Sequence, residues 1–288
     1  MTVQNPETSG DGRFPPFGTF APTPREQRII RLTSAMPQFW LGKRLAFALR
    51  KLATKGLNHP LDVEVFGQRM RLNPFANVAA KRILFTPQYF DGFERGKLAE
   101  KAQATEGEFV FLDIGANVGG WSMFVAGLLG PRARVLAFEP QPSIRDELAF
   151  NIAQNPGSNI TLYPYALCDR DGEVEMYLAP HNRGESSLQQ GTKHAAPIRV
   201  PGRTLLGVLQ EAGVKRVHAL KIDVEGVEDL VLIPFLDKAP DALLPEMVVI
   251  EDSRRRWKSD VIAALGARGY AVTSSFRMNL ILERPAGA

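Results

Sequence analysis

FVFLDIGANVGG, residues 109–120, is the stretch that decides the fold. Its first four residues are apolar and rich in aromatic and branched side chains, as expected for a strand that is covered on both faces. Asp113 follows, the glycines at 115 and 119 allow a sharp turn, and helical spacing of apolar residues resumes at Trp121. Because the start of a helix offers free N–H groups, this unit predicts a nucleotide-like ligand, with Asp113, Gly115, Asn117 and Gly119 as candidate binding residues.

A second candidate for this ligand site is Glu139, which follows the next predicted strand, residues 134–138. In a first βαβ unit a carboxylate at this position lies beside a ribose and accepts hydrogen bonds from its hydroxyl groups. The G-x-G-x-x-G pattern of dinucleotide-binding proteins is absent, since residue 117 is Asn, and this disfavours a pyrophosphate. An acid two residues before the first glycine suits a ligand with a positive centre and an amino acid tail, as in S-adenosylmethionine.

The composition is that of an ordinary folded protein with one α/β domain and an appendage: 288 residues, 44% hydrophobic and 23% charged. The net charge of +4 is unevenly distributed, because residues 25–58 hold eight Lys or Arg and a single acid. We find no apolar run long enough to span a membrane and no signal-peptide core in the first 30 residues. We therefore expect a cytoplasmic protein, with peripheral contact to the inner face of the membrane as an option. The basic stretch is too short to predict nucleic-acid binding.

Three regions are expected along the chain: a disordered arm at residues 1–24, an N-terminal basic helix and cover at residues 25–105, and a cofactor-binding domain at residues 106–288. The arm is rich in Pro and Gly. Residues 37–55 have the spacing of a basic amphipathic helix, which either contacts an anionic membrane surface or a phosphate-bearing lipid carrier, or packs on the domain with its charges solvated. A small hairpin at residues 61–72 and helices at residues 76–85 and 94–102 are expected to cover the main sheet.

From residue 109 onward predicted strands and helices alternate, which indicates an α/β fold with a doubly wound, mostly parallel sheet. The last two strands resemble a hairpin, so the sheet is expected to end in an antiparallel pair. The predicted strands are 109–113, 134–138, 159–163, 173–178, 197–200, 217–222, 246–250, 270–274 and 279–283, and the helices are 119–129, 142–154, 204–212, 226–233 and 255–268.

The segment ALKIDVEGVE, residues 219–228, predicts another strand that ends in acids and turns at a glycine. Lys221, Asp223 and Glu225 have the same parity, so they would point to one side while the strand lasts. In an open α/β sheet the ligand lies outside the carboxyl ends of the strands, which places Asp223 and Glu225 in the crevice with the first motif. Either carboxylate could accept a proton, and the alternative for Glu225 is to cap the next helix.

Two further groups of residues have side chains that could bind a metal or act as a general base. Glu251 and Asp252 follow a strand and would reach the same edge as Asp223, where oxygen ligands suit magnesium, but no other pattern supports a metal. His181 lies in a long connection, residues 179–196, and is a reserve candidate for a general base. This connection and the cover are expected to shape the acceptor pocket.

With these motifs in place, the chain resembles the FkbM family of S-adenosylmethionine-dependent methyltransferases, which have the class I methyltransferase fold (Rossmann-like). The resemblance covers residues 60–284 and rests on DIGANVG at 113–119, FEP at 138–140 and KIDVEG at 221–226. It implies methyl transfer to an oxygen, commonly a hydroxyl of a sugar, glycolipid or polyketide, and it places Ala166 and Leu167 close to the adenine. Trp121, directly after the glycines, departs from the family pattern and would line or crowd the pocket.

Methyl transfer requires the protein to align oxygen, methyl carbon and sulfur and to remove the hydroxyl proton. Asp223 and Glu225 are predicted near the methyl group, and the resemblance does not decide which of them takes the proton. An NAD-dependent dehydrogenase or epimerase is the alternative enzyme, which the missing glycine pattern and the lack of Tyr-x-x-x-Lys disfavour. A membrane-surface binding module that retains a methyltransferase-like core is the non-enzymatic alternative.

Overall fold

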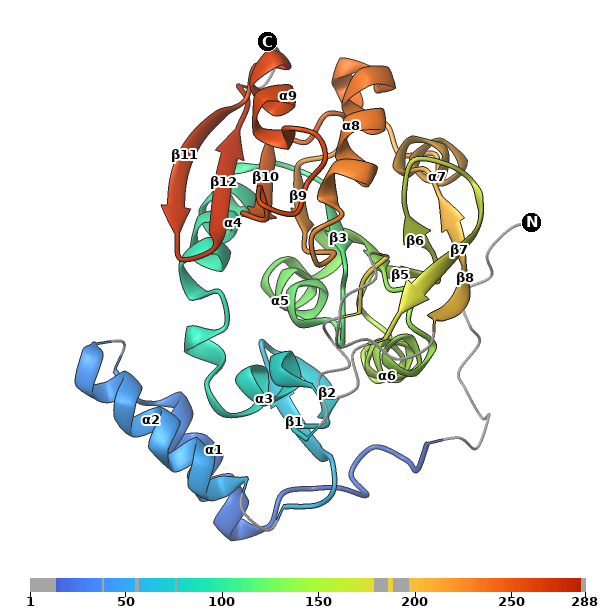
Figure 1. Cartoon of the computed structure of the whole chain (residues 1–288). Coiled ribbons are helices and arrows are strands. Elements are labelled where there is room, and N and C mark those ends of the chain that lie inside the picture. Colours follow the sequence, from blue (N-terminus) through green and yellow to red (C-terminus); the bar gives the residue numbers. More distant parts are fainter. Residues whose placement is uncertain are drawn as a thin grey trace.

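The computed structural model describes residues 14–37, 39–54, 57–75, 77–178, 186–188 and 197–285. Its centre is a seven-stranded sheet in the order β11-β12-β10-β9-β3-β4-β5 (Figure 1). In chain order these strands are β3 (Phe109–Ile114), β4 (Ala133–Phe138), β5 (Ile160–Tyr163), β9 (Ala219–Ile222), β10 (Met247–Glu251), β11 (Ala271–Phe276) and β12 (Asn279–Glu283).

Five of these strands are parallel, from β10 through β9, β3 and β4 to β5. The other two are antiparallel, β12 to β10 and β11 to β12, with a register shift in β11 between Val272 and Ser274. The predicted α/β fold with a mostly parallel sheet and a C-terminal antiparallel hairpin is therefore confirmed. The carboxyl ends of β3, β4 and β9 meet at one edge, where the order of the strands reverses and ligands bind in such folds.

The two faces of the sheet pack against different groups of helices, as the alternation of β3 requires. Phe109 and Phe111 point into a core shared with α5 (Gly120–Leu129) and α6 (Pro142–Ala153). Val110 and Leu112 point into a second core, which α7 (Leu205–Glu211), α8 (Glu228–Lys238) and α9 (Val261–Ala267) complete. Burial on both faces explains why β3 is apolar along its length.

The N-terminal cover packs into the first of these cores. It consists of the hairpin β1 (Leu61–Val65) and β2 (Gln68–Leu72), followed by α3 (Val78–Phe85), η1 (Pro87–Tyr89) and α4 (Gly92–Ala104). Met70, Ile83 and Leu98 are fully buried there together with residues of β3. The cover is thus part of the main hydrophobic core, and both predicted helices lie within about two residues of their observed ends.

The N-terminal arm differs from the prediction for residues 14–24, which we expected to be disordered. Arg71 pairs with Asp62 at 2.6 Å and donates hydrogen bonds to the carbonyls of Pro15 and Pro16, while Asp62 also accepts from the N–H of Gly18. A buried ion pair that needs these backbone groups as partners gives the segment a fixed position despite its prolines. Residues 1–13 lie outside the described residues.

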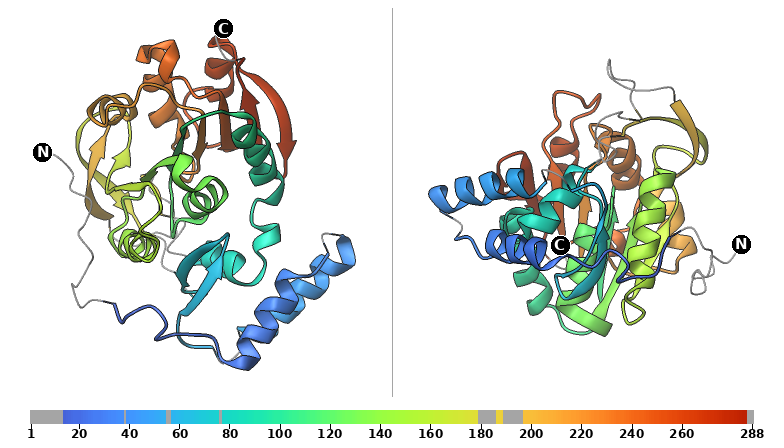
Figure 2. Two further views of the ribbon diagram at one scale, coloured as in Figure 1. Left: turned by 180° about the vertical axis from the view of Figure 1, so that it is seen from behind. Right: turned by 90° about the horizontal axis from the view of Figure 1, so that it is seen from below.

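Helix α1 (Pro24–Ser34) was not predicted, although its start has a clear sequence signal. The hydroxyl oxygen of Thr23 accepts from the N–H of Glu26, and the carboxylate of Glu26 accepts from the N–H of Thr23, a capping box with Pro24 at the first position. The predicted basic helix is α2 (Trp40–Ala53), and the figures show α1 and α2 side by side at the margin of the molecule (Figure 2). Within the described residues, no helix has both the length and the apolar character that crossing a bilayer requires.

A third, three-stranded sheet contains β6 (Ala166–Leu167), β8 (Pro197–Arg203) and β7 (Gly172–Tyr177) in that order. The strands predicted at 173–178 and 197–200 therefore belong to this small sheet rather than to the main one. Short 3-10 turns, η2 (Gly130–Arg132) and η4 (Asp241–Leu243), precede β4 and β10. Helix α9 begins six residues later than predicted, because Asp260 caps it through the N–H groups of Ile262 and Ala263.

Candidate functional site

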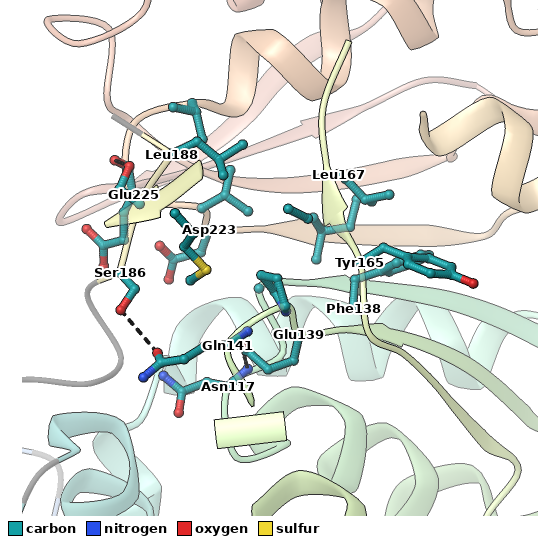
Figure 3. Close-up of a pocket in the computed structure, with 18 of the residues that line it drawn as sticks. Asn117, Phe138, Glu139, Gln141, Tyr165, Leu167, Ser186, Leu188, Asp223 and Glu225 are labelled. Carbon is teal, nitrogen blue, oxygen red and sulfur yellow. Dashed lines mark hydrogen bonds between the residues drawn. The ribbon is translucent and has the colours of Figure 1, made fainter. Parts of the chain in front are cut away.

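A pocket lies at the carboxyl ends of β3, β4 and β9, beneath the small sheet (Figure 3). Seven of the residues selected from the sequence line it: Gly115, Asn117, Glu139, Ala166, Leu167, Asp223 and Glu225. The first motif and the turn after β9 are about 110 residues apart in sequence, and the tip of β4 lies between them. All three meet at one place because parallel strands share their carboxyl edge. We call this the cofactor pocket.

Gly115 allows the close approach that forms the floor of the cofactor pocket. Its φ is +78°, and a Cβ at this position would lie 2.0 Å from the carbonyl oxygen of Asp223. The N–H of Asp223 donates to the carbonyl of Ile114 at 3.0 Å, so the ends of β3 and β9 are held together there. Any other residue would both strain the backbone and push these strand ends apart.

Glu139 has the geometry of a ribose-binding carboxylate. Its Oε2 accepts a hydrogen bond from the N–H of Asn117 at 2.9 Å, and its Oε1 accepts from the N–H of Gln141 at 3.0 Å. Each carboxylate oxygen has a second acceptor position, which leaves capacity for two vicinal hydroxyl groups. The side chain is nearly buried, and this burial raises the pKa of Glu139 to about 7 despite the two N–H donors.

The part of the pocket opposite Asp223 and Glu225 is lined by apolar and aromatic side chains. Phe138, Tyr165 and Leu167 lie together on one side of the close-up, whereas Asp223 and Glu225 lie on the other (Figure 3). A purine ring fits between side chains of this kind because it has two apolar faces and polar edges. The pocket therefore offers an adenine slot next to a ribose carboxylate, and the residues present fit S-adenosylmethionine.

Two predicted cofactor residues, Asp113 and Gly119, do not line the pocket. Asp113 is 1% exposed, and its Oδ2 accepts hydrogen bonds from both the N–H and the hydroxyl of Ser122 at the start of α5. Burial raises the pKa of Asp113. Gly119 begins α5 with a φ of +91°, where a Cβ would lie 2.6 Å from Leu148. The observed contacts of both residues are with α5 and α6, and they fix the start of α5.

The long connection contributes residues that the sequence did not indicate as cofactor ligands. The hydroxyl of Ser186 lies 3.1 Å from Oε1 of Gln141, and the hydroxyl of Ser187 donates to the carbonyl of Glu225 at 3.1 Å. Together with Leu188 they line the cofactor pocket. We expect this connection to shape the acceptor pocket, and its described residues, 186–188, line the cofactor pocket. His181, the reserve candidate, lies outside the described residues.

A second, larger cavity of about 820 Å³ adjoins the cofactor pocket. Its walls come from α2, α3, the start of α4 and the β11–β12 turn, so the N-terminal cover contributes to it. Three residues line both spaces, namely Gly115, Asn117 and Asp223. Trp121 lines this cavity rather than the cofactor pocket, and its indole N–H donates to Asp91 at 3.2 Å. We call this space the acceptor cavity.

Lys221 and Asp223 form an ion pair at the boundary between the two spaces. The ammonium of Lys221 lies 3.2 Å from Oδ2 of Asp223, and Lys221 is 8% exposed. Burial alone would lower the pKa of Lys221, but the carboxylates of Asp223, Asp113 and Asp91 raise it above its ordinary value. Lys221 therefore stays charged and fixes the side chain of Asp223 where both cavities meet.

Asp223 and Glu225 both lie beyond the carboxyl end of β9 and line the cofactor pocket, as residues of the turn that follows the strand. Strand β9 ends at Ile222, and Glu225 has a φ of 60° in the turn that follows, so the alternation of a strand no longer applies. Glu225 lines only the cofactor pocket, with its Oε2 3.7 Å from Arg256. Val227, the residue before α8, makes no side-chain cap hydrogen bond, whereas Glu228, the first residue of α8, is fully buried and accepts from the N–H groups of Val224 and Gly226 in the preceding turn.

Three carboxylates, of Asp223, Glu228 and Glu251, each place an oxygen within 4.8 Å of the others. Glu228 uses its oxygens for the turn before α8 and for the indole N–H of Trp257, so its position has a structural explanation. Burial, followed by the nearby charge of Asp223, raises the pKa of Glu251. Asp252, the other expected ligand, pairs with Arg254 at 2.6 Å. We assign no metal to this group.

Comparison with known proteins identifies a family for this chain. Residues 113–272 match the model of the methyltransferase FkbM domain. The AMB antimetabolite synthetase AmbE of Pseudomonas aeruginosa is 29% identical over 60% of this chain and 10% of its own length. Methyltransferase sdnD of Sordaria araneosa is 27% identical over 56% of this chain and 73% of its own length. The 2-O-methyltransferase NoeI of Sinorhizobium fredii is 28% identical over 43% of this chain and 56% of its own length. The chain thus spans about a tenth of AmbE and just over half of NoeI.

Proposed function

The chain belongs to the FkbM family of methyltransferases, and from that premise we propose that it methylates a hydroxyl oxygen of a sugar-like small molecule with S-adenosylmethionine as the methyl donor. Family membership makes the chain an S-adenosylmethionine-dependent methyltransferase with the class I fold, in place of the dehydrogenase or epimerase alternative. The choice of an oxygen acceptor draws on NoeI, whose name states a 2-O-methyl transfer, and the choice of a sugar draws on a relative from Haloferax volcanii that is named hexuronic acid methyltransferase AglP.

The observation that carries the proposal is that the cofactor pocket and the acceptor cavity meet at Asp223. When bound, S-adenosylmethionine supplies an activated methyl group. Glu139 would hold the ribose hydroxyls, and Phe138, Tyr165 and Leu167 would enclose the adenine. A hydroxyl group in the acceptor cavity could then approach the methyl carbon from the side of Asp223, as in-line displacement requires.

Asp223 is the residue that we propose as proton acceptor. Its ion pair with Lys221 holds the carboxylate at the boundary, within hydrogen-bond reach of a hydroxyl placed there. Glu251 lies beside it on the wall of the acceptor cavity, with a raised pKa and a hydrogen bond from Ser253. In this arrangement Asp223 takes the proton of the acceptor hydroxyl. Glu225 positions the cofactor.

The test is a titration followed by an activity screen. Calorimetry with S-adenosylmethionine and S-adenosylhomocysteine should give micromolar dissociation constants, whereas NAD should not bind. Methyl transfer to a panel of monosaccharides and glycosides is then measured by mass spectrometry. Binding of NAD, or methyl transfer to nitrogen acceptors in preference to hydroxyl groups, would contradict the proposal.

We also propose that α2 contacts an anionic membrane surface with its outward face. Trp40, Leu41 and Leu45 are 69%, 58% and 48% exposed, and Lys51 is exposed on the same helix. Apolar side chains accompanied by cations are typical of helices that lie in the headgroup region of a bilayer. Co-sedimentation with vesicles that contain anionic phospholipid should be lost in Trp40→Ser, whereas methyl transfer to a dissolved acceptor should be unchanged. Equal binding of both proteins would exclude this contact.

A further inference from the structure

We propose that the acceptor carries an anionic group, a carboxylate or a phosphate, and that Lys43, Arg50 and Arg277 bind this group inside the acceptor cavity. The inference rests on the proposed function, because it concerns the molecule that receives the methyl group. It narrows the acceptor class from sugars in general to sugar acids and sugar phosphates.

The three cations reach the acceptor cavity from two elements that are far apart in sequence. Lys43 and Arg50 are half-buried on the inward face of α2, and both lie over the ring of Phe47, at 5.7 Å for the ammonium and 4.5 Å for the guanidinium. Arg277 is at the tip of the β11–β12 turn, with its guanidinium 5.2 Å from the ring of Phe276. All of these residues line the acceptor cavity.

None of these three cations has a carboxylate partner among the described residues, in contrast to Arg82 and Lys221 of the same cavity. Arg82 pairs with Asp91 and Lys221 pairs with Asp223, both at 3.2 Å. The carboxylates of Asp91 and Asp223 therefore neutralise other side chains of the cavity. Lys43 and Arg50 are partly removed from water whereas Arg277 is exposed. An unpaired cation that is partly removed from water is costly, and a bound anion would reduce this cost for Lys43 and Arg50.

Burial and the mutual repulsion of the cations lower the pKa of Lys43 and of Arg50. Burial lowers the pKa of Lys43, and the charges of Arg277 and Arg82 lower it further. Burial and then the charge of Arg82 lower the pKa of Arg50. Residues from α2, α3 and the β11–β12 turn thus direct positive charge at a common region of the cavity, which is the arrangement that recognises carboxylate and phosphate groups.

The same cavity also offers acceptors for hydroxyl groups. Glu94 is 1% exposed, and its Oε1 accepts from the side-chain amide of Asn279 at 2.7 Å, whereas its Oε2 has no partner among the described residues. Oε1 of Gln88 is also buried without a partner in this part of the chain. A ligand with hydroxyl groups would satisfy both oxygens. An acceptor with several hydroxyl groups and one negative charge therefore matches the polar groups of the cavity.

The experiment measures binding of soluble probes to the full chain saturated with S-adenosylhomocysteine. Glucuronic acid, glucose 1-phosphate and glucose are titrated by calorimetry at one ionic strength. We expect at least one of the two anions to bind about tenfold more tightly than glucose, as for a charge-assisted hydrogen bond that glucose cannot make. The anion that binds better identifies the group, carboxylate or phosphate. Equal affinity for all three probes would overturn the inference.

Variants test whether the named cations are responsible. The double variant Lys43→Gln, Arg277→Gln should lose about tenfold or more in affinity for the anion and keep its weak affinity for glucose. Arg44→Gln is the matched control, because Arg44 follows Lys43 on α2 but is exposed and lies outside the cavity. An equal loss in the control would overturn the inference. The anion titrations are repeated without S-adenosylhomocysteine, so a failure of cofactor binding counts against the proposed function alone.

Discussion

The cofactor pocket and the acceptor cavity adjoin each other, but they are built in different ways. The cofactor pocket lies at the carboxyl ends of neighbouring parallel strands, and its polar contacts are largely made by backbone groups, as at Glu139. The acceptor cavity takes its walls from α2, α3, α4 and the β11–β12 turn, which join the sheet from both ends of the chain. The cofactor pocket is a property of the fold, whereas the acceptor cavity depends largely on elements outside the parallel strands. In such elements substrate specificity can change without loss of the core.

The largest expected effect is at Gly115, where the two spaces share a backbone contact. Gly115→Ala should reduce the free energy of unfolding by about 3 kcal/mol or more, because the φ of +78° is strained for alanine and the new methyl group would meet the carbonyl of Asp223. Thermal and urea unfolding measure this loss. Gly157→Ala is the control, since a Cβ there meets nothing within 4 Å and no positive φ is required. Similar stability of the two variants would mean that the strand ends can separate at little cost.

Asp223 and Glu225 test the separation of the two spaces, since Asp223 lines both of them and Glu225 lines the cofactor pocket but not the acceptor cavity. Asp223→Asn should lower kcat about 100-fold and leave the affinity for S-adenosylhomocysteine nearly unchanged, because an amide cannot accept the hydroxyl proton. Glu225→Gln should instead raise the KM for S-adenosylmethionine and change kcat little. Steady-state kinetics with both substrates varied separates these outcomes. A large fall in kcat for Glu225→Gln would return Glu225 to the proton transfer.

The buried carboxyl of Glu139 predicts a pH dependence confined to the cofactor pocket. Its pKa is about 7, above the ordinary value of 4.5, because burial disfavours the charged form. Hydroxyl donors of a ribose favour the carboxylate, so binding is weakened at low pH, where the group is protonated, and strengthens as pH rises through about 7. The affinity for S-adenosylhomocysteine should therefore rise about tenfold between pH 6 and pH 8.

Glu139→Gln is the control for this pH dependence. Its affinity should be lower than that of the natural protein at pH 8 and should change little with pH, because the amide does not titrate. Any titration of the ligand itself affects both proteins equally and cancels in the difference. Parallel pH profiles for the two proteins would show that the carboxyl of Glu139 is not the group that responds.

The difference between the two spaces also explains which of their residues could be predicted from the sequence. Strand β3, the glycine turn and Glu139 were predicted because short motifs with fixed spacing dictate them, and the residues at 113–119 and 221–226 also indicated the family. The end of β9 at Ile222 was predicted, but the conformation of Glu225 in the turn that follows, with a φ of 60°, is not visible in the local pattern. The hydrogen bonds that the carboxylate of Glu228 accepts are recognisable only with the turn and Trp257 in place.

Contacts between distant segments account for the other differences. The order of residues 14–24 depends on Arg71 and Asp62, which lie more than 40 residues further along the chain. Ser186 reaches the cofactor pocket through a hydrogen bond with Gln141, 45 residues earlier in the sequence. The cations of the acceptor cavity come from α2 and the β11–β12 turn, which no single-segment pattern connects. The missed helix α1 is different, because its capping box at Thr23 and Glu26 was readable in the sequence.

The smallest expected effect tests whether the β11–β12 turn serves the acceptor alone. Met278 is 63% exposed and lines the acceptor cavity but not the cofactor pocket. Met278→Ser should raise the KM for the acceptor about threefold, as expected for the loss of part of one apolar contact, and should leave the dissociation constant of S-adenosylhomocysteine unchanged. Val272→Ser is the matched control, because Val272 is 48% exposed on the same hairpin and does not line the cavity. If Met278→Ser weakened cofactor binding as well, the turn would act on both spaces, and the separation between a cofactor pocket set by the sheet and an acceptor cavity set by its additions would not hold.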